Sequence, residues 1–276
     1  MSNLAKITCF LFDNGSRRPA STLALRRVAN RLSDVIGCKV EPVSLLHSDS
    51  IAPAELAGQR ARLLEESLQE FGEEAGKVAV ALPLFFGPSG ALHEYLPPRL
   101  EVLAGRYPDT RFILANCLES ARDDSASILS QAIQREISST VTAAEFSHPA
   151  VLVTDHGSPL IEVTRVRDRV GTNLARSWPT AQVASMERRD GPDYTFNEPL
   201  LETAVQTLAA KGEKEIIVAL QFLFAGRHAG EGGDIAQICD TAVEKNPELR
   251  IATTQPIGES PEVLQLLERR FREAAV

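Results

Sequence analysis

The chain has 276 residues, of which 43% are hydrophobic and 24% charged, and it carries a formal net charge of −8. This length suits two domains with sizeable cores, while the negative charge argues against a surface that binds nucleic acid or anionic membranes. No apolar run approaches the roughly 20 residues that cross a bilayer, so we expect no membrane partner.

The N-terminus and the cysteines indicate a compartment. The segment from Met1 to Asp13 holds one lysine and then a strand-like run, which is unlike a secretory signal peptide. Four cysteines are scattered without paired spacing: Cys9, Cys38, Cys117 and Cys239. We interpret them as reduced core thiols, neither disulfides nor zinc ligands, and we expect a cytoplasmic protein.

Strand-like and helix-like patterns alternate along the first half of the chain. The predicted strands are residues 7–12, 39–46, 77–86 and 111–115. The predicted helices are residues 19–35, a long polar helix over 53–74, a proline-broken helix after Gly90, and residues 123–137. The segment 138–149 is rich in Ser, Thr and Ala, and we interpret it as a linker.

The same pattern starts again in the second half. Its predicted strands are residues 150–154, 181–186, 215–224 and 250–255, and its predicted helices are residues 160–177, 196–211, 234–245 and 261–272. The run Asp13-Asn14-Gly15-Ser16 recurs as Asp155-His156-Gly157-Ser158. We therefore predict a duplication, with an N-terminal domain over 1–140 and a C-terminal domain over 149–276.

This alternation predicts the fold class. Four strands alternating with helices in each half imply parallel sheets with right-handed crossovers. We expect an α/β protein of two tandem flavodoxin-like domains, each a four-stranded parallel sheet flanked by helices. We expect the chain to be either a monomer whose two halves resemble a dimer or a homodimer. In such open sheets, ligands bind at the carboxyl ends of the strands.

Three polar residues follow the first three predicted strands of the second half. They are His156, Glu187 and His228. In a 2-1-3 strand order these strands are neighbours about 4.8 Å apart, so the side chains can converge over one crevice. Two imidazoles and a carboxylate suit a divalent transition metal with open coordination positions. They also suit proton transfer near neutral pH.

The first half lacks this set. At the corresponding strand ends we place Asn14, His47 and Gly90, and Asn and Gly are poor metal ligands. His93 lies three residues beyond Gly90. We interpret the first half as a degenerate copy and expect His47 and His93 to matter much less than His156 and His228.

Three motifs together resemble the class II chelatases, the sirohydrochlorin cobaltochelatase family with its iron- and nickel-inserting relatives. They are Asp155-His156-Gly157-Ser158, Met186-Glu187 and Phe222-Leu223-Phe224-Ala225-Gly226-Arg227-His228. The resemblance covers the chain as a long form with two tandem copies. One departure follows the second histidine, where two extra residues delay Asp234-Ile235 and Ala236 replaces a proline.

The resemblance implies ATP-independent insertion of a divalent metal into sirohydrochlorin or a related tetrapyrrole, in siroheme- or cobalamin-type biosynthesis. It implies that His156 and His228 bind the metal and that Glu187 assists them. The metal is then a substrate, with no organic cofactor, and the ligand set suits Co²⁺, Fe²⁺ and Ni²⁺ alike.

Such a substrate carries several carboxylates, so we expect arginine forks near the site. The candidate substrate-binding residues are Arg188, Arg189, Arg227, Ser158 and Gly226. In the alternative interpretation, the arginines form ordinary loop salt bridges with Asp190, Asp193 or Glu231.

Two other functions compete with the chelatase: a non-catalytic metal- or tetrapyrrole-binding protein of the same fold and, more distantly, a phosphatase-like hydrolase that uses His156. The intact set of two histidines and one glutamate favours the enzyme. No phosphate-cradling glycine-rich loop accompanies His156, which weakens the hydrolase. We expect Asp155 to cap the helix that follows it.

Overall fold

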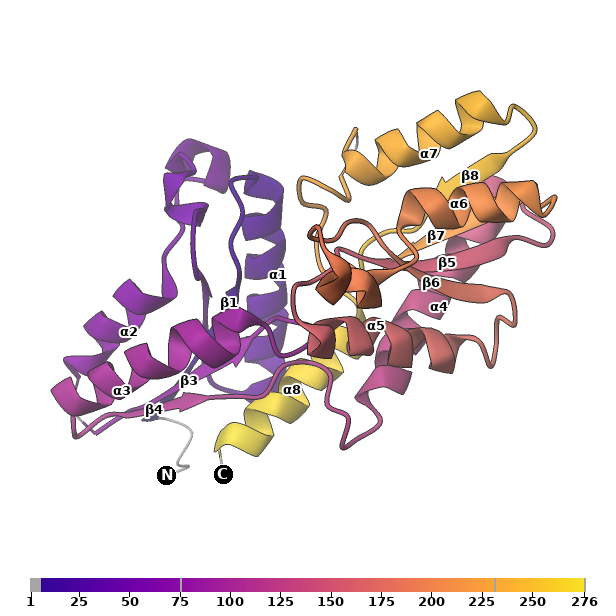
Figure 1. Ribbon diagram of the computed structural model, residues 1–276. Helices are drawn as coiled ribbons and strands as arrows, with labels where there is room; N and C mark the ends of the chain where they lie inside the picture. Colours follow the sequence, from indigo (N-terminus) through magenta and orange to yellow (C-terminus); the bar gives the residue numbers. More distant parts are fainter. Residues whose placement is uncertain (1–5, 75, 231, 276) are drawn as a thin grey trace. The chain divides into compact units, whose positions relative to one another are not determined.

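The computed structural model describes residues 6–74, 76–230 and 232–275, drawn in Figure 1. These residues form two compact units. Unit 1 comprises the described residues within 1–120 and 263–276, and unit 2 comprises those within 121–262. Each unit holds one four-stranded parallel sheet flanked by helices, so the predicted fold class is confirmed.

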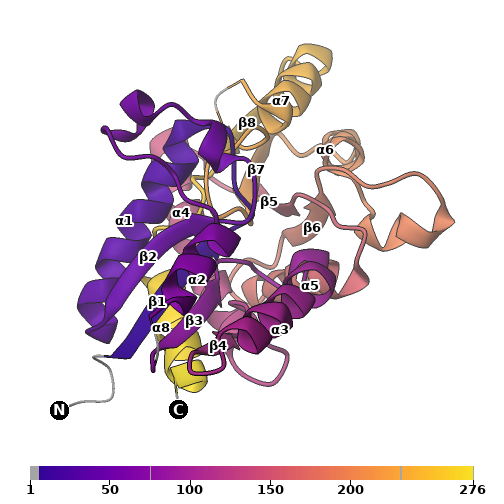
Figure 2. The ribbon, with the colours of Figure 1, turned by 90° about the vertical axis from the view of Figure 1, so that its left-hand side faces the viewer.

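The sheet of unit 1 has the order β2-β1-β3-β4. Its strands are β1 (Ile7–Asp13), β2 (Lys39–Ser44), β3 (Val78–Pro83) and β4 (Arg111–Leu114). Its helices include α1 (Pro19–Ile36), α2 (Leu64–Gly72) and α3 (Leu96–Arg106). Figure 2 shows α2 and α3 on the opposite side of the sheet from α1. Phe10 and Phe12 of β1 pack with apolar residues of α2 and α3 in one core.

The sheet of unit 2 has the equivalent order β6-β5-β7-β8. Its strands are β5 (Ala150–Asp155), β6 (Ala181–Ser185), β7 (Glu215–Leu220) and β8 (Arg250–Thr253). Its helices are α4 (Ser125–Ala144), α5 (Ile161–Leu174), α6 (Leu201–Ala210) and α7 (Asp234–Lys245). Because helices cover both faces, β5 and β7 are almost entirely buried, and apolar residues fill β5 up to Val153 and β7 from Ile216 onward. β5 lies between β6 and β7, as the 2-1-3 order requires.

The last helix of each half packs in the other half's unit. Helix α4 follows β4 along the chain but contacts α5, β7 and β8. Helix α8 (Pro261–Ala275) follows β8, yet its Arg270 donates hydrogen bonds to the carbonyls of Cys117 and Leu118 in unit 1. The predicted division at residues 140 and 149 follows the sequence repeat, whereas the packing units follow this exchange of helices.

The predicted linker over 138–149 was wrong, because α4 continues to Ala144. The hydroxyls of Ser138, Thr140 and Thr142 each donate to the carbonyl four residues earlier. The hydroxyls thus bond within the helix instead of forming the turns that Ser and Thr otherwise favour, so composition alone was misleading here.

The predicted long helix over 53–74 was also wrong. The structure has a short 3₁₀ turn at Pro53–Leu56, and α2 begins only at Leu64. Ala57 and Gly58 adopt φ angles of 56° and 80°, a left-handed backbone that ends helical structure. Within the described residues, no helix has the length and apolar character needed to span a bilayer.

A buried carboxyl group ends β1. Oδ1 of Asp13 is buried and has no hydrogen-bond partner among the described residues. Burial raises the pKa of Asp13 from 3.8 to about 6, and hydrogen bonds from Ser44 and the Gly15 backbone offset only part of that effect.

This carboxyl group gives a pH-dependent stability. The folded protein holds the Asp13 proton more tightly than the unfolded chain, so the contribution is full below pH 3.8 and is lost as pH rises to about 6. We expect Asp13→Asn to raise the free energy of unfolding at pH 7.5 by about 2–3 kcal/mol relative to the parent. The gain should nearly vanish at pH 4. Urea unfolding across this range measures it, and a gain independent of pH would contradict the assignment.

Candidate active site

The loops after β5 and β6 are in direct backbone contact. The amide of Glu187 donates to the carbonyl of His156 at 3.2 Å. Gly157 adopts φ +90°, and a Cβ there would lie 1.9 Å from the Glu187 carbonyl oxygen. Only glycine fits this position, because any side chain would push the two loops apart. The backbone thus fixes His156 and Glu187 as neighbours.

The side chains of His156 and Glu187 face one another across this contact. Nε2 of His156 lies 3.7 Å from Oε1 of Glu187. The histidine side chain is 47% exposed and the glutamate 59% exposed, so both groups are accessible to a ligand.

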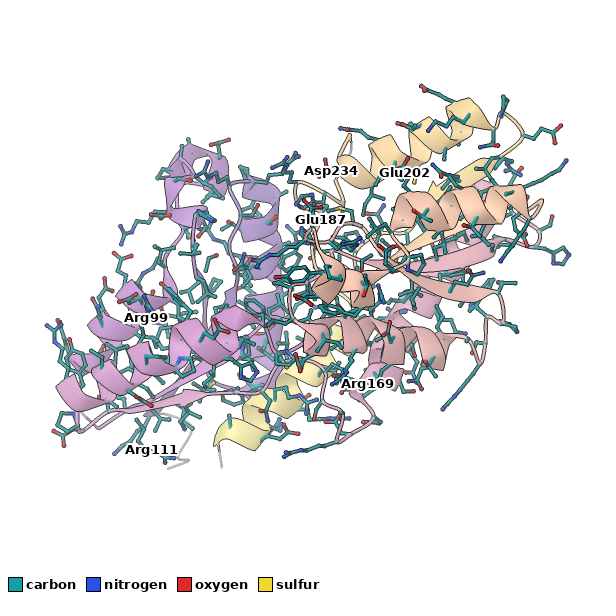
Figure 3. The ribbon with its side chains drawn as sticks, in the orientation of Figure 1. Arg99, Arg111, Arg169, Glu187, Glu202 and Asp234 are labelled. Atoms are coloured by element: carbon teal, nitrogen blue, oxygen red, sulfur yellow. The ribbon has the colours of Figure 1, made fainter. Side chains whose placement is uncertain are left out.

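His228 lies in the loop that follows β7 and meets His156 edge to face. The two ring centroids are 4.6 Å apart, with an angle of 84° between the ring planes. Nδ1 of His228 hydrogen-bonds to Oδ2 of Asp234, the first residue of α7. This bond orients the ring and leaves Nε2 as the nitrogen able to bind a metal. Asp234, labelled with Glu187 in Figure 3, was not predicted as a site residue.

A close approach lets Asp234 reach back to the histidine. A Cβ on Gly233 would lie 2.6 Å from the carbonyl oxygens of both Arg227 and His228. The amide of Ile235 donates to the His228 carbonyl at 3.2 Å. The start of α7 is therefore pinned to His228 despite the two extra residues in this loop. An aspartate directly after glycine at a helix start was the available sequence signal.

The site consists of two facing imidazoles, each beside one carboxylate. The neighbouring strands do bring His156, Glu187 and His228 to one sheet edge, as the strand order predicts. Within the described residues, however, no three His, Cys, Asp or Glu side chains are grouped closely enough to hold a metal ion together. The arrangement offers two nitrogen ligands and two proton acceptors at an accessible position.

A buried polar network lies beneath the His156 loop. The Ser185 hydroxyl donates to Oδ1 of Asp155 at 2.5 Å, and Nη1 of Arg167 donates to the Ser185 oxygen at 2.6 Å. Burial raises the pKa of Asp155, while the Ser185 hydrogen bond and the Arg167 charge oppose the rise. The prediction that Asp155 caps the next helix was wrong: it accepts the Gly157 amide, and α5 has no side-chain cap.

Two of the predicted substrate-binding arginines are engaged differently. Arg188 pairs through Nε with Oε1 of Glu198 at 2.7 Å and also donates to the carbonyls of Arg189 and Gly191. All these partners of Arg188 lie between β6 and α6. Arg188 therefore forms a loop salt bridge, as the alternative interpretation predicted, but its partner is Glu198. The Arg189 guanidinium lies 5.9 Å from the ring centre of Tyr194.

The remaining candidates fall into two groups. Arg227 is exposed and makes no hydrogen bond or ion pair with another residue that the structure describes, while Glu231 lies outside that part of the chain. Ser158 has a structural role, because its hydroxyl accepts the Leu160 amide. The Gly226 amide donates to the Phe224 carbonyl within the loop after β7.

The first half presents a different edge. Asn14 stands where His156 stands, and the Leu46 amide donates to its carbonyl at 3.2 Å. Leu46 therefore corresponds to Glu187, and placing His47 there was wrong by one residue. His47 itself begins a short turn with φ 68°, and His93 lies in the turn Ala91–Tyr95 that leads into α3. Asn14 and Leu46 offer no pair of metal ligands.

Comparisons with known proteins give one family match, in the second half of the chain, and several similar folds that span both halves. Residues 150–274 match the CbiX family model. The fold is similar to SirB from Bacillus subtilis with Fe³⁺ (16% identity, covering 98% of this chain and 96% of that one, TM-score 0.73). It is similar to SirB from Bacillus subtilis subspecies spizizenii in complex with cobalt (15%, 98% and 95%, TM-score 0.71). It also resembles CbiX, the terminal enzyme for siroheme biosynthesis in denitrifying bacteria (15%, 97% and 98%, TM-score 0.61). No curated protein matches the sequence.

The contact between the first two loops can be tested by adding one methyl group. Gly157→Ala places a Cβ against the Glu187 carbonyl at an unfavourable φ, so we expect a loss of about 2–4 kcal/mol in the free energy of unfolding. Gly105→Ala in α3 is the control, because its Cβ would meet nothing within 4 Å. Chemical denaturation measures both variants, and equal effects would refute the close approach.

Proposed function

Taking the confirmed class II chelatase resemblance as the premise, we propose that this protein inserts a divalent metal ion into sirohydrochlorin or a related tetrapyrrole without ATP. The observation that carries the proposal is the pair of facing imidazoles at the carboxyl edge of β5 and β7, with ring centroids 4.6 Å apart. Residues 150–274, the part of the chain that matches the CbiX family, contain this pair.

The proposed reaction exchanges one metal ion for two protons. The free-base macrocycle loses the protons of two pyrrole nitrogens as M²⁺ enters, so the products are the metallated macrocycle and two protons. Neutral His156 and His228 deliver the metal and accept protons. Glu187 and Asp234, the carboxylates beside the two rings, stabilise the resulting imidazolium charge and pass protons to solvent.

Two nitrogen ligands with adjacent carboxylates suit Co²⁺, Fe²⁺ and Ni²⁺. The two SirB structures hold Fe³⁺ and cobalt, and we propose Co²⁺ or Fe²⁺ first, with Ni²⁺ as the next candidate. A site with few protein ligands favours metal transfer over storage, which weighs against the non-catalytic binding protein. We also propose a cytoplasmic location, which suits the four free cysteines. The proposed oligomeric state is a monomer or a homodimer.

The two histidines should be required for insertion, whereas those of the first half should not. We expect His156→Ala and His228→Ala each to lower the insertion rate at least a hundredfold, because each removes a metal ligand and a proton acceptor. His47→Ala and His93→Ala should stay within twofold of the parent. The assay follows sirohydrochlorin absorbance with Co²⁺, Fe²⁺ and Ni²⁺ in turn. Loss confined to the His47 or His93 variant would move the site to the first half.

Arg227 is the best placed of the predicted arginines to bind a substrate carboxylate. It directly precedes His228, and it is exposed. We expect Arg227→Leu to raise the KM for the tetrapyrrole about tenfold, equivalent to about 1.4 kcal/mol, because it removes one charged hydrogen bond. Its effect on metal affinity should be small.

The matched control for Arg227 is Arg176→Leu. Arg176 is also exposed but follows the C-terminal end of α5, away from the carboxyl edge of the strands. The KM of this variant should equal that of the parent. An unchanged KM in the Arg227 variant would show that this arginine does not contact the substrate.

A further inference from the structure

We infer that Arg167 is a positioning residue of the site proposed above: its buried guanidinium fixes the loops that carry His156 and Glu187. The effect of Arg167 on metal binding rests on the proposed function. Its effect on the order of the two loops can be measured without any metal or substrate.

The guanidinium of Arg167 is enclosed and fully used. Its side chain is 2% exposed. Nη1 donates to the Ser185 hydroxyl oxygen at 2.6 Å and to the Asn197 carbonyl at 3.0 Å, and Nη2 donates to the Phe196 carbonyl at 3.3 Å. Asp168 accepts from Nε and Nη2. Burying an arginine is costly, so such a group is retained only where its hydrogen bonds compensate.

The network joins the two site loops through neighbouring strands. Ser185 and Asp155 are partners in the register of β5 and β6, and Ser185 donates to the Asp155 carboxylate at 2.5 Å. Asp155 directly precedes His156, and Ser185 lies two residues before Glu187. Arg167 therefore holds the last residue of β6 directly and the last residue of β5 through the Ser185 hydroxyl.

A third segment is held by the same guanidinium. Asn197, whose carbonyl accepts from Arg167, is fully buried. Its side chain accepts the Ser158 amide at 3.0 Å and donates to the Ser158 carbonyl at 2.9 Å. The loop 156–158 is thus tied at both ends, through Asp155 and through Ser158. Metal and proton-transfer sites lose function when their supporting contacts are loose by a fraction of an ångström.

The first half of the chain is an internal comparison that lacks this arginine. Leu25 stands twelve residues after Asp13, as Arg167 stands twelve residues after Asp155, and both lie buried on the helix that follows. The next residue, Arg26, donates instead to the carbonyls of Leu56 and Gln59. The half without the arginine is also the half with Asn14 and Leu46 in place of His156 and Glu187. The arginine and the site residues therefore occur together in the second half of the chain, and the first half has neither at the corresponding positions.

The test compares three variants of the full chain. Arg167→Leu introduces the residue of the first half, and Arg167→Lys keeps the charge but removes the planar fork. Arg270→Leu is the matched control. The Arg270 side chain is also 2% exposed and donates to two backbone carbonyls, but it lies in unit 1. Circular dichroism sets a temperature at which all the variants compared are folded.

The first measurement is amide hydrogen exchange of Gly157 and Glu187, which needs no metal. We expect exchange at least tenfold faster in both Arg167 variants and unchanged in the Arg270 variant. The second is titration with Co²⁺, followed in the visible spectrum. We expect at least tenfold weaker binding and an altered spectrum in the Arg167 variants only, with His156→Ala as the reference for a lost ligand.

Unchanged exchange in the Arg167 variants, or an equal change in the Arg270 variant, would overturn the inference. If Arg167→Leu does not fold, Arg167→Lys decides by the same criteria. If the parent protein binds Co²⁺ no better than His156→Ala, the proposed function fails while hydrogen exchange still decides the role of Arg167.

Discussion

The carboxyl edge of unit 2 depends on one buried ionic constraint. Asp155 ends a strand that is buried on both faces, so its carboxylate must be paired there rather than hydrated. Ser185 and Arg167 supply that pairing from β6 and α5. Because these partners belong to different elements, satisfying one carboxylate also fixes where two loops leave the sheet. The exposed His156 is thus held in position by the buried, hydrogen-bonded groups beneath its loop.

The same strand end in unit 1 shows what happens without the constraint. Asp13 keeps its serine, but Leu25 replaces the arginine and Oδ1 has no described partner. Burial raises the pKa of both carboxyl groups, but only at Asp155 does the Arg167 charge oppose the rise. Gly15 still approaches the next loop as closely as Gly157 does, with a Cβ only 1.7 Å from the Leu46 carbonyl. The backbone of the repeat has therefore been kept, while the chemistry of its edge has not.

The proposed function is consistent with an edge that offers few protein ligands to a metal ion. A chelatase must take up a metal ion and release it into a macrocycle, and a closed shell of protein ligands would oppose that release. Here each imidazole is supported by one carboxylate and remains accessible. Glu187, in the loop after β6, lies beside His156, whereas Asp234, at the start of α7, lies beside His228. The two rings therefore have different carboxylate neighbours.

The sequence alone determined the alternation of strands and helices, the duplication, and the histidines at the ends of β5 and β7, because periodicity and short motifs are local properties. Composition was a poor guide to two segments, the predicted linker over 138–149 and the predicted helix over 53–74. Hydroxyl bonding within α4 and the left-handed Ala57-Gly58 pair depend on backbone geometry, which composition does not reveal. The contacts made by Arg167, Ser185, Asn197 and Asp234 became visible only in the tertiary structure. Arg167 and Asn197, for example, are in contact although 30 residues separate them in the sequence. Asp234 contacts His228 across the loop that follows β7. The exchange of α4 and α8 was equally hidden, since each helix has an ordinary amphipathic pattern and only packing decides which sheet it covers.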